Sequence, residues 1–270
     1  MIPAAFSYRR ASTVDEALAL LAEHGDDAKV LAGGHSLLPL MKLRLAAPEY
    51  LVDIAPIDEL RYVRLDGDEV VIGALSRYHD LERDPVLLEH APLLAHVSGA
   101  VGDRQVRHRG TLGGSLVHAD SAADLPAAAL ASDAVFVLRG PSGERRIPAS
   151  EFFLGPFTTP MEPDELLTEI RLPRQTGLGW GFEKFTRRAI DWAMVGVAVV
   201  DGRVGLINMG GVPLRASATE AALASGASIE EAAALASDGT TPPDEPHATA
   251  EYRRHLGRVL TRRALAAAAG

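Results

Sequence analysis

The sequence predicts an α+β fold, and three observations support this prediction. Alternating apolar residues flank Asp66-Gly67 and Asp201-Gly202, two dipeptides typical of the turns in antiparallel hairpins. Helical periodicity recurs in separate segments of the chain. The predicted strands seldom alternate regularly with helices, as a parallel sheet would require. The pattern changes near residues 174–178, where we place a domain boundary.

The first part of the chain, up to this boundary, mixes short strands with helices. Its first helix follows a capping-box arrangement, in which Ser12 and Thr13 precede Asp15 and Glu16, and it ends at Gly25. Strands are expected at 29–32, 50–54, 62–65, 69–72, 134–138 and 145–147, and further helices at 85–101 and 124–131.

The second part begins with longer antiparallel strands and ends in helices. The strands are expected at 181–186, 193–200 and 203–209. The helices are expected at 216–224, 229–236 and 249–267, with a proline-rich linker over 240–246 before the last one.

Composition excludes several functions. The net charge of −9 over 270 residues argues against a nucleic-acid surface, which needs Lys and Arg to displace phosphate counterions. Because the chain has no cysteine, it can hold no disulfide, iron–sulfur cluster or thiolate zinc site. No segment approaches the roughly 18 to 20 apolar residues of a membrane span. The first residues lack the pattern of a secretory signal, so we expect a cytoplasmic protein.

A first glycine turn, Ala32-Gly33-Gly34-His35-Ser36, follows a predicted strand. Paired glycines let backbone N–H groups converge, and with a serine hydroxyl they suit a diphosphate. The alternative is a tight turn without a ligand. The pattern is not G-x-G-x-x-G, so it does not favour a Rossmann fold.

A second glycine turn, Arg109-Gly110-Thr111-Leu112-Gly113-Gly114-Ser115, precedes Asp120 and Asp124. Two nests of this kind could hold one diphosphate from both sides. The alternative is a loop followed by a helix that Asp124 stabilises at its N-terminus. The residues alone leave both interpretations open.

Both turns also resemble a known family. The run 31–44 and the runs 107–115 and 119–126 are similar to the two FAD loops of molybdenum hydroxylase flavoprotein subunits. This family includes the medium subunits of carbon monoxide dehydrogenase and the flavin domain of xanthine dehydrogenase. Ile72-Gly73-Ala74 resembles the strand between the loops, and residues 185–196 and 209–213 resemble the smaller C-terminal domain. The resemblance covers nearly the whole chain.

The resemblance implies a two-part PCMH-type FAD-binding domain over 1–175, with subdomains of about 1–56 and 57–175. A small α+β domain with an antiparallel sheet and helices would follow over 176–270. It also implies noncovalent FAD, and we predict no catalytic residue and no metal ligand. The implied FAD-binding residues are Ala32, Gly33, Gly34, His35, Ser36, Leu37, Val101, Thr111, Gly113, Gly114, Ser115, Asp120, Asp124, Leu167, Lys184 and Trp192.

Four of these residues have more specific implied roles. Asp124 resembles the family's carboxylate near the nucleotide, and Lys184 a basic residue near the flavin ring. Trp192 is placed like an aromatic side chain that covers the isoalloxazine, although a core tryptophan is the alternative. His35 stands where many family members have glutamine, and we expect it to make a polar contact instead of a covalent bond to FAD.

The family function is electron transfer. A large molybdenum-cofactor subunit and a small subunit with [2Fe-2S] clusters would supply electrons to this FAD, which would pass them to an external acceptor. The implied assembly is a dimer of heterotrimers, attached to a membrane only through the complex. The sequence of the first loop, Gly33-Gly34-His35-Ser36-Leu37-Leu38-Pro39, most resembles that of carbon monoxide dehydrogenase medium subunits, which favours carbon monoxide as the substrate of the complex. The alternatives are a free-standing FAD oxidase and a non-catalytic flavin-binding assembly subunit.

Overall fold

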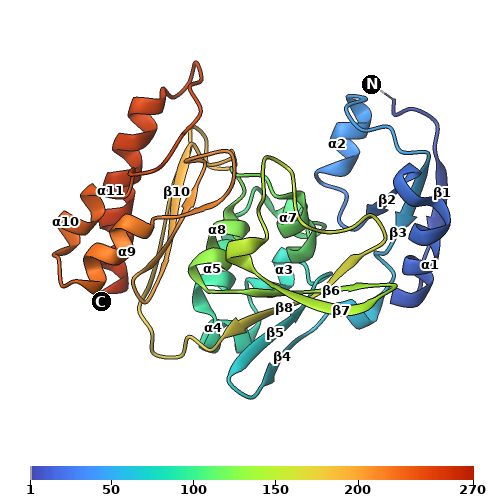
Figure 1. The fold of residues 1–270 in the computed structure, drawn as a ribbon, viewed down its shortest axis with the longest axis horizontal. Helices are drawn as coiled ribbons and strands as arrows, with labels where there is room; N and C mark the ends of the chain where they lie inside the picture. The colour runs from blue at the N-terminus through green and yellow to red at the C-terminus, as the bar shows by residue number, and fades with distance from the viewer. Residues whose placement is uncertain (1) are drawn as a thin grey trace.

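The computed structural model describes residues 2–270, which form three β-sheets in consecutive parts of the chain (Figure 1). The three sheets have the orders β1-β3-β2, β4-β5-β8-β6-β7 and β12-β11-β10-β9. Helices cover these sheets and connect their strands. This mixture of sheets and helices, with an antiparallel C-terminal sheet, confirms the predicted fold class.

The first sheet is parallel, which corrects the expectation that no parallel sheet is present. It contains β1 (Ser7–Arg10), β3 (Tyr50–Asp53) and β2 (Ala28–Leu31). Helix α1 (Val14–His24) connects β1 to β2, and α2 (Leu37–Lys42) lies between β2 and β3. Strand β1 was missed because it is a polar edge strand whose last three residues are exposed, so it has no apolar pattern.

The second sheet is antiparallel and has an unpredicted central strand, β8 (Leu166–Pro173). This strand was not predicted because charged residues interrupt its apolar pattern. The buried Arg171 pairs with Asp66, Glu69 and Glu169, which satisfy its guanidinium group within the sheet. The other strands are β4 (Val63–Asp66), β5 (Glu69–Gly73), β6 (Val135–Gly140) and β7 (Gly143–Pro148).

The helix expected over 85–101 is wrong as a single element. The structure divides it into α4 (Pro85–His90) and α5 (Pro92–Ala100), and Ala91 between them has a φ of −150°. Pro92 lacks an N–H and disfavours a helical residue before it, so one helix ends and the next begins there. The neighbouring helices are α3 (Tyr78–Leu81), α6 (Arg104–Arg107), α7 (Leu112–His118) and α8 (Asp124–Ala131).

The third sheet lies between two layers of helices (Figure 1). Helix α11 (Ala250–Ala268) covers one face, and α8 with α5 packs on the other. Every residue of β10 (Val195–Val200) is buried because both faces are covered. The remaining elements are β9 (Trp180–Phe185), β11 (Arg203–Ile207), β12 (Leu214–Arg215), α9 (Ser217–Ala224) and α10 (Ile229–Ala234).

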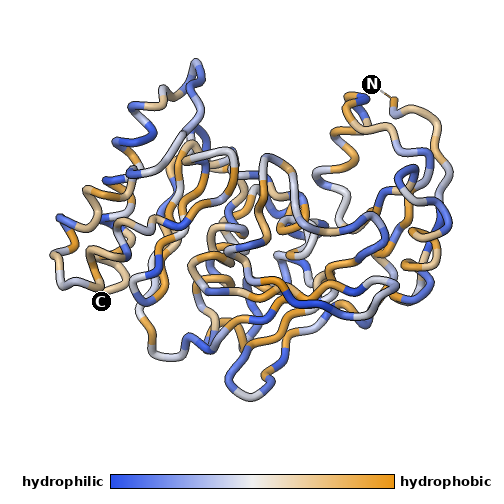
Figure 2. Tube along the Cα trace, in the orientation of Figure 1, coloured by the Kyte–Doolittle hydropathy of each residue, from blue (hydrophilic) through white to orange (hydrophobic). Residues whose placement is uncertain are grey.

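Hydropathy follows these layers (Figure 2). The central strands are largely hydrophobic, whereas the tip of the β4–β5 hairpin is hydrophilic. One buried cluster joins the second sheet, helices α4, α5, α7 and α8, and residues Ala198 and Val200 of β10. Helix α8 therefore lies in a continuous core between the second and third sheets. Short 3₁₀ helices occur at Gly25–Asp27, Asp58–Leu60 and Ala149–Glu151.

Candidate cofactor site

The first glycine turn connects the C-terminal end of β2 to the start of α2. Within residues 2–270, no backbone or side-chain group accepts a hydrogen bond from the N–H groups of Gly33 through Leu37. The Ser36 hydroxyl, at the N-cap position of α2, makes no capping bond. Five consecutive free N–H donors beside a free hydroxyl form the kind of concavity that binds a phosphate or diphosphate.

The glycines are required by the backbone here. A Cβ on Gly33 would lie 2.3 Å from the carbonyl oxygen of Arg109, so only glycine allows the first loop to touch the second. Gly34 has a φ of +76°, a left-handed conformation that side chains disfavour. The structure thus brings together the two turns that the sequence singled out.

The second glycine turn is mostly helical, which differs from the expected nest. Thr111 caps α7, and its Oγ1 accepts from the N–H of Gly114 at 3.3 Å. The N–H of Gly113 donates to the carbonyl of Ala74 at 2.9 Å, and that of Ser115 to the carbonyl of Thr111 at 3.1 Å. These N–H groups are therefore already satisfied, and this turn offers a ligand its backbone surface and hydroxyl groups.

Gly113 is needed in α7 for packing. A Cβ there would lie 2.7 Å from the Cβ of Ala74 and 2.8 Å from its carbonyl oxygen. Glycine destabilises a helix by about 1 kcal/mol relative to alanine, so the close contact explains its presence. Ala74 in turn bonds through its N–H to Thr168 of β8, which fixes the second turn to the central sheet.

A buried ion pair lies between the second and third sheets. Asp124, the first residue of α8, is 4% exposed, and its Oδ2 lies 2.7 Å from the Nζ of Lys184 in β9. Lys184 also donates to the carbonyl of Ala100 at 3.3 Å. Burial raises the pKa of Asp124, and the Lys184 ammonium partly opposes this shift. The second carboxylate oxygen of Asp124, Oδ1, is buried without a hydrogen-bond partner among the described residues. It can therefore accept a hydrogen bond from a bound ligand.

Tyr78 joins the second turn to this pair, and the sequence analysis missed it. A Cβ on Gly110 would lie 2.3 Å from the Tyr78 ring, which therefore supports the turn. Burial raises the pKa of Tyr78 to about 12, while hydrogen bonding by Ser115 lowers it and the charge of Asp124 raises it. The only sequence signal is a lone tyrosine after a short strand, which does not indicate this position.

The other predicted site residues lie in different settings. His35 is exposed, with its Nδ1 at 3.2 Å from the Gly33 carbonyl oxygen. Asp120 bonds the N–H of Ala122 within its own turn, and Leu167 is buried in β8. Val101 is the half-buried C-cap residue of α5, next to Ala100.

Trp192 is 60% exposed in the loop between β9 and β10. This exposure excludes the alternative of a core tryptophan. Ile190 in the same loop is also 60% exposed, so an apolar surface flanks the end of the strand that carries Lys184. A planar ring that stacked on Trp192 would cover part of this surface.

Two other classes of feature are absent from the described residues. Residues 2–270 contain no cluster of three or more His, Cys, Asp or Glu side chains arranged to hold a metal ion. Over the same residues, no helix combines the length and the apolar character needed to cross a membrane.

Two family descriptions match the chain. "FAD binding domain in molybdopterin dehydrogenase" matches residues 4–175, and "CO dehydrogenase flavoprotein C-terminal domain" matches residues 180–268. The donors of the first loop and the free oxygen of Asp124 suit FAD, which carries both a diphosphate and a ring with hydrogen-bonding edges.

Individual relatives are similar over their full length. The chain is 43% identical to the carbon monoxide dehydrogenase medium chain of Hydrogenophaga pseudoflava, over 99% of this chain and 98% of the relative. It is 38% identical to the glyceraldehyde dehydrogenase medium chain of Sulfolobus acidocaldarius, over 98% of each. A solved structure of the Hydrogenophaga pseudoflava carbon monoxide dehydrogenase matches with a TM-score of 0.96 and 44% identity, over 99% of this chain and 98% of that chain.

The ion pair between Asp124 and Lys184 yields a prediction about stability. Asp124→Ala or Lys184→Ala should each lower the free energy of unfolding by about 3–5 kcal/mol, because each leaves an uncompensated buried charge. The double variant should lose clearly less than the sum of the two. Urea unfolding of all three variants measures this coupling.

The exposed pair of Asp15 and Arg139, at 2.6 Å, is the matched control. Its double-mutant cycle should give a coupling of at most about 1 kcal/mol. Additive losses at Asp124 and Lys184 would show that their contact does not contribute to stability.

Proposed function

The chain belongs to the FAD-binding medium subunits of the molybdenum hydroxylase family, and from this premise we propose that it passes electrons from partner subunits through its FAD to an external acceptor. It is an FAD-containing oxidoreductase subunit of the carbon monoxide dehydrogenase and xanthine dehydrogenase type. The observation that carries the proposal is the set of free N–H groups at Gly33 through Leu37, held against the second turn.

The diphosphate of FAD would lie on the first loop. Gly33, Gly34, His35, Ser36 and Leu37 supply backbone donors there, and the Ser36 hydroxyl adds a further one. From the second turn, Thr111 and Ser115 would supply hydroxyl groups, while Gly113 and Gly114 keep the backbone surface free of side chains. Such donors bind a charged oxygen more strongly than a neutral one.

The flavin end would lie towards the buried ion pair. The free Oδ1 of Asp124 can accept a hydrogen bond from a ring N–H, and the Lys184 ammonium favours the ionised form of this carboxyl group against the effect of burial. Trp192 would cover the ring, Ala32 would wrap the diphosphate with the rest of the first loop, and Val101, Asp120 and Leu167 would contact other parts of FAD. FAD itself supplies the two-electron chemistry, whereas the chain binds and orients it.

The electrons would come from other chains. This chain has no cysteine to bind an iron–sulfur cluster, and its relatives are named medium chains. We therefore infer a large subunit with the molybdenum cofactor and a small subunit with [2Fe-2S] clusters, assembled as a dimer of heterotrimers. The greater identity to the carbon monoxide dehydrogenase chain supports carbon monoxide as the substrate of the complex.

The proposal also covers the domain division of the chain and the location of the complex. The chain would divide into an FAD-binding domain over 1–175, with subdomains of about 1–56 and 57–175, and a C-terminal domain over 176–270. The three sheets and the two family matches support this division. The complex would be cytoplasmic and would reach a membrane only through its partners.

FAD should be present and noncovalently bound. The purified chain is expected to contain about one FAD, which acid precipitation releases fully into the supernatant, because the exposed His35 has no anchoring environment. Flavin absorbance of the supernatant and the precipitate measures this. Flavin that stays with the precipitate would show a covalent bond.

The Ser36 hydroxyl should contribute to affinity without contributing to stability. Ser36→Ala removes a donor that makes no hydrogen bond among residues 2–270, so the free energy of unfolding without FAD should stay unchanged. The Kd for FAD should rise by about tenfold or more, because a hydrogen bond to a charged group contributes a free energy of about that size to binding. Fluorescence titration of FAD-free protein measures the Kd.

Ser142→Ala, in the exposed turn between β6 and β7, is the control and should leave the Kd unchanged. An unchanged Kd in Ser36→Ala would mean that the first loop does not hold the diphosphate through this hydroxyl.

A further inference from the structure

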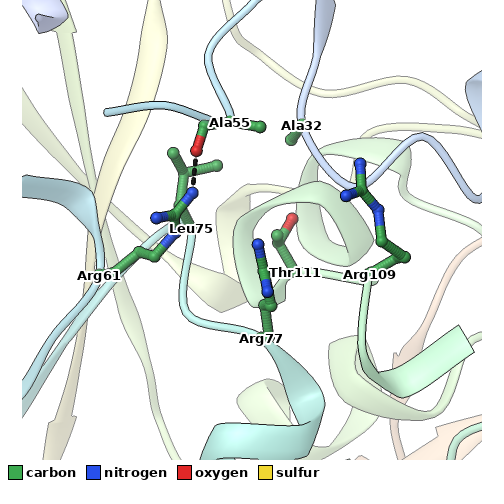
Figure 3. A pocket seen from close by; sticks show the side chains of 7 residues that line it. All are labelled: Ala32, Ala55, Arg61, Leu75, Arg77, Arg109 and Thr111. Carbon is green, nitrogen blue, oxygen red and sulfur yellow. Dashed lines mark hydrogen bonds between the residues drawn. The ribbon is translucent and has the colours of Figure 1, made fainter. Parts of the chain in front are cut away.

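A small pocket lined by three arginines lies beside the two glycine turns (Figure 3). Arg61, Arg77 and Arg109 come from three separate segments, and the pocket is completed by Ala32, Ala55, Leu75 and Thr111. Figure 3 shows the three guanidinium groups around the same space. The walls enclose about 220 Å³, including the open mouth of the pocket. Ala32 begins the first glycine turn, and Arg109 and Thr111 belong to the second, so the pocket adjoins the proposed cofactor site.

The positive charge of this pocket is only partly neutralised. Arg61 bonds the carbonyl of Ala55 and pairs with Asp58, while its Nε is buried without an acceptor. Within residues 2–270, the guanidinium groups of Arg77 and Arg109 make no hydrogen bond and no ion pair. Arg171, the buried arginine of the central sheet, is by contrast paired with three carboxylates.

Three guanidinium groups around one space repel one another, and an anion would remove this cost. Guanidinium groups bind phosphate oxygens through two parallel hydrogen bonds. The N–H of Thr111 also makes no hydrogen bond within the described residues, and it lies in the wall of the same pocket. The guanidinium groups of Arg77 and Arg109, the Nε of Arg61 and this N–H are therefore without a partner among the described residues, and all suit an oxyanion.

We propose that Arg61, Arg77 and Arg109 form a binding pocket for a phosphoryl group next to the two glycine turns. The closed part of the pocket has room for no more than about one water molecule. The phosphoryl group would therefore sit at the mouth, between Arg77 and the exposed Arg109, with one oxygen directed towards Arg61.

This phosphoryl group has two possible sources. One is the diphosphate of FAD, in which case the inference rests on the proposed function and adds arginines to it. The other is a free phosphate or phosphate ester that binds beside FAD. The two sources differ in whether bound FAD blocks the pocket.

Calorimetric titration of inorganic phosphate into the full chain, with and without FAD, tests the proposal. FAD-free protein should bind phosphate, and Arg77→Gln with Arg109→Gln should weaken this binding by about tenfold or more. Arg77→Lys with Arg109→Lys keeps the charge but lacks the paired N–H groups, so it should restore only part of the affinity. Arg146→Gln, which removes an exposed charge from β7, is the control and should bind as the unaltered chain does.

The titration of FAD-loaded protein then separates the sources. Loss of phosphate binding after FAD is added assigns the pocket to the FAD diphosphate, and retained binding assigns it to a separate phosphate. The proposal is overturned if the FAD-free chain binds no phosphate, or if the double glutamine variant binds it as tightly as the unaltered chain. The latter result would place phosphate on the free N–H groups of the first loop. A chain that takes up no FAD contradicts the proposed function, and phosphate binding by that chain would still support the pocket.

Discussion

The close approach of two backbone segments organises this protein. At Gly33 the first loop lies so near the carbonyl of Arg109 that any side chain would collide with it, at 2.3 Å for a Cβ. The parallel sheet, which ends in the first loop, is thereby fixed against the second turn and the central sheet. Because this contact is made by backbone atoms, it positions the free N–H groups of Gly33 through Leu37 without depending on side-chain rotamers. A rigid arrangement of donors loses little entropy when it binds an anion.

Burial by the C-terminal sheet completes the site at its other end. Helix α8 packs between the second and third sheets, so Asp124 at its first position is removed from water. A buried carboxylate is costly unless it is paired, and Lys184 of the third sheet supplies the partner. The orientation of Asp124 therefore depends on correct docking of the C-terminal part. The cofactor site is therefore complete only when the C-terminal sheet packs against helix α8.

Local signals in the sequence predicted the hairpins, most helices and both glycine turns, whereas features that depend on distant contacts were missed. Strand β8 was hidden because Arg171 is satisfied by Asp66 and Glu69, about a hundred residues earlier in the chain. Strand β1 is an exposed edge, so its parallel pairing leaves no apolar pattern. The break at Pro92 follows a local rule and could have been predicted. At the site, Tyr78, Arg61 and Arg77 were missed because only the folded chain brings them to the glycine turns.

The central claim is that this chain carries FAD but takes its electrons from partner subunits. The most direct test is the flavin absorbance of the isolated, FAD-loaded chain under anaerobic carbon monoxide, compared with that of the complete complex. Dithionite should bleach the flavin in both samples, and carbon monoxide should bleach it in the complex alone. Bleaching of the isolated chain by carbon monoxide would show that the chain oxidises substrate by itself, as a free-standing oxidase, and would contradict this account.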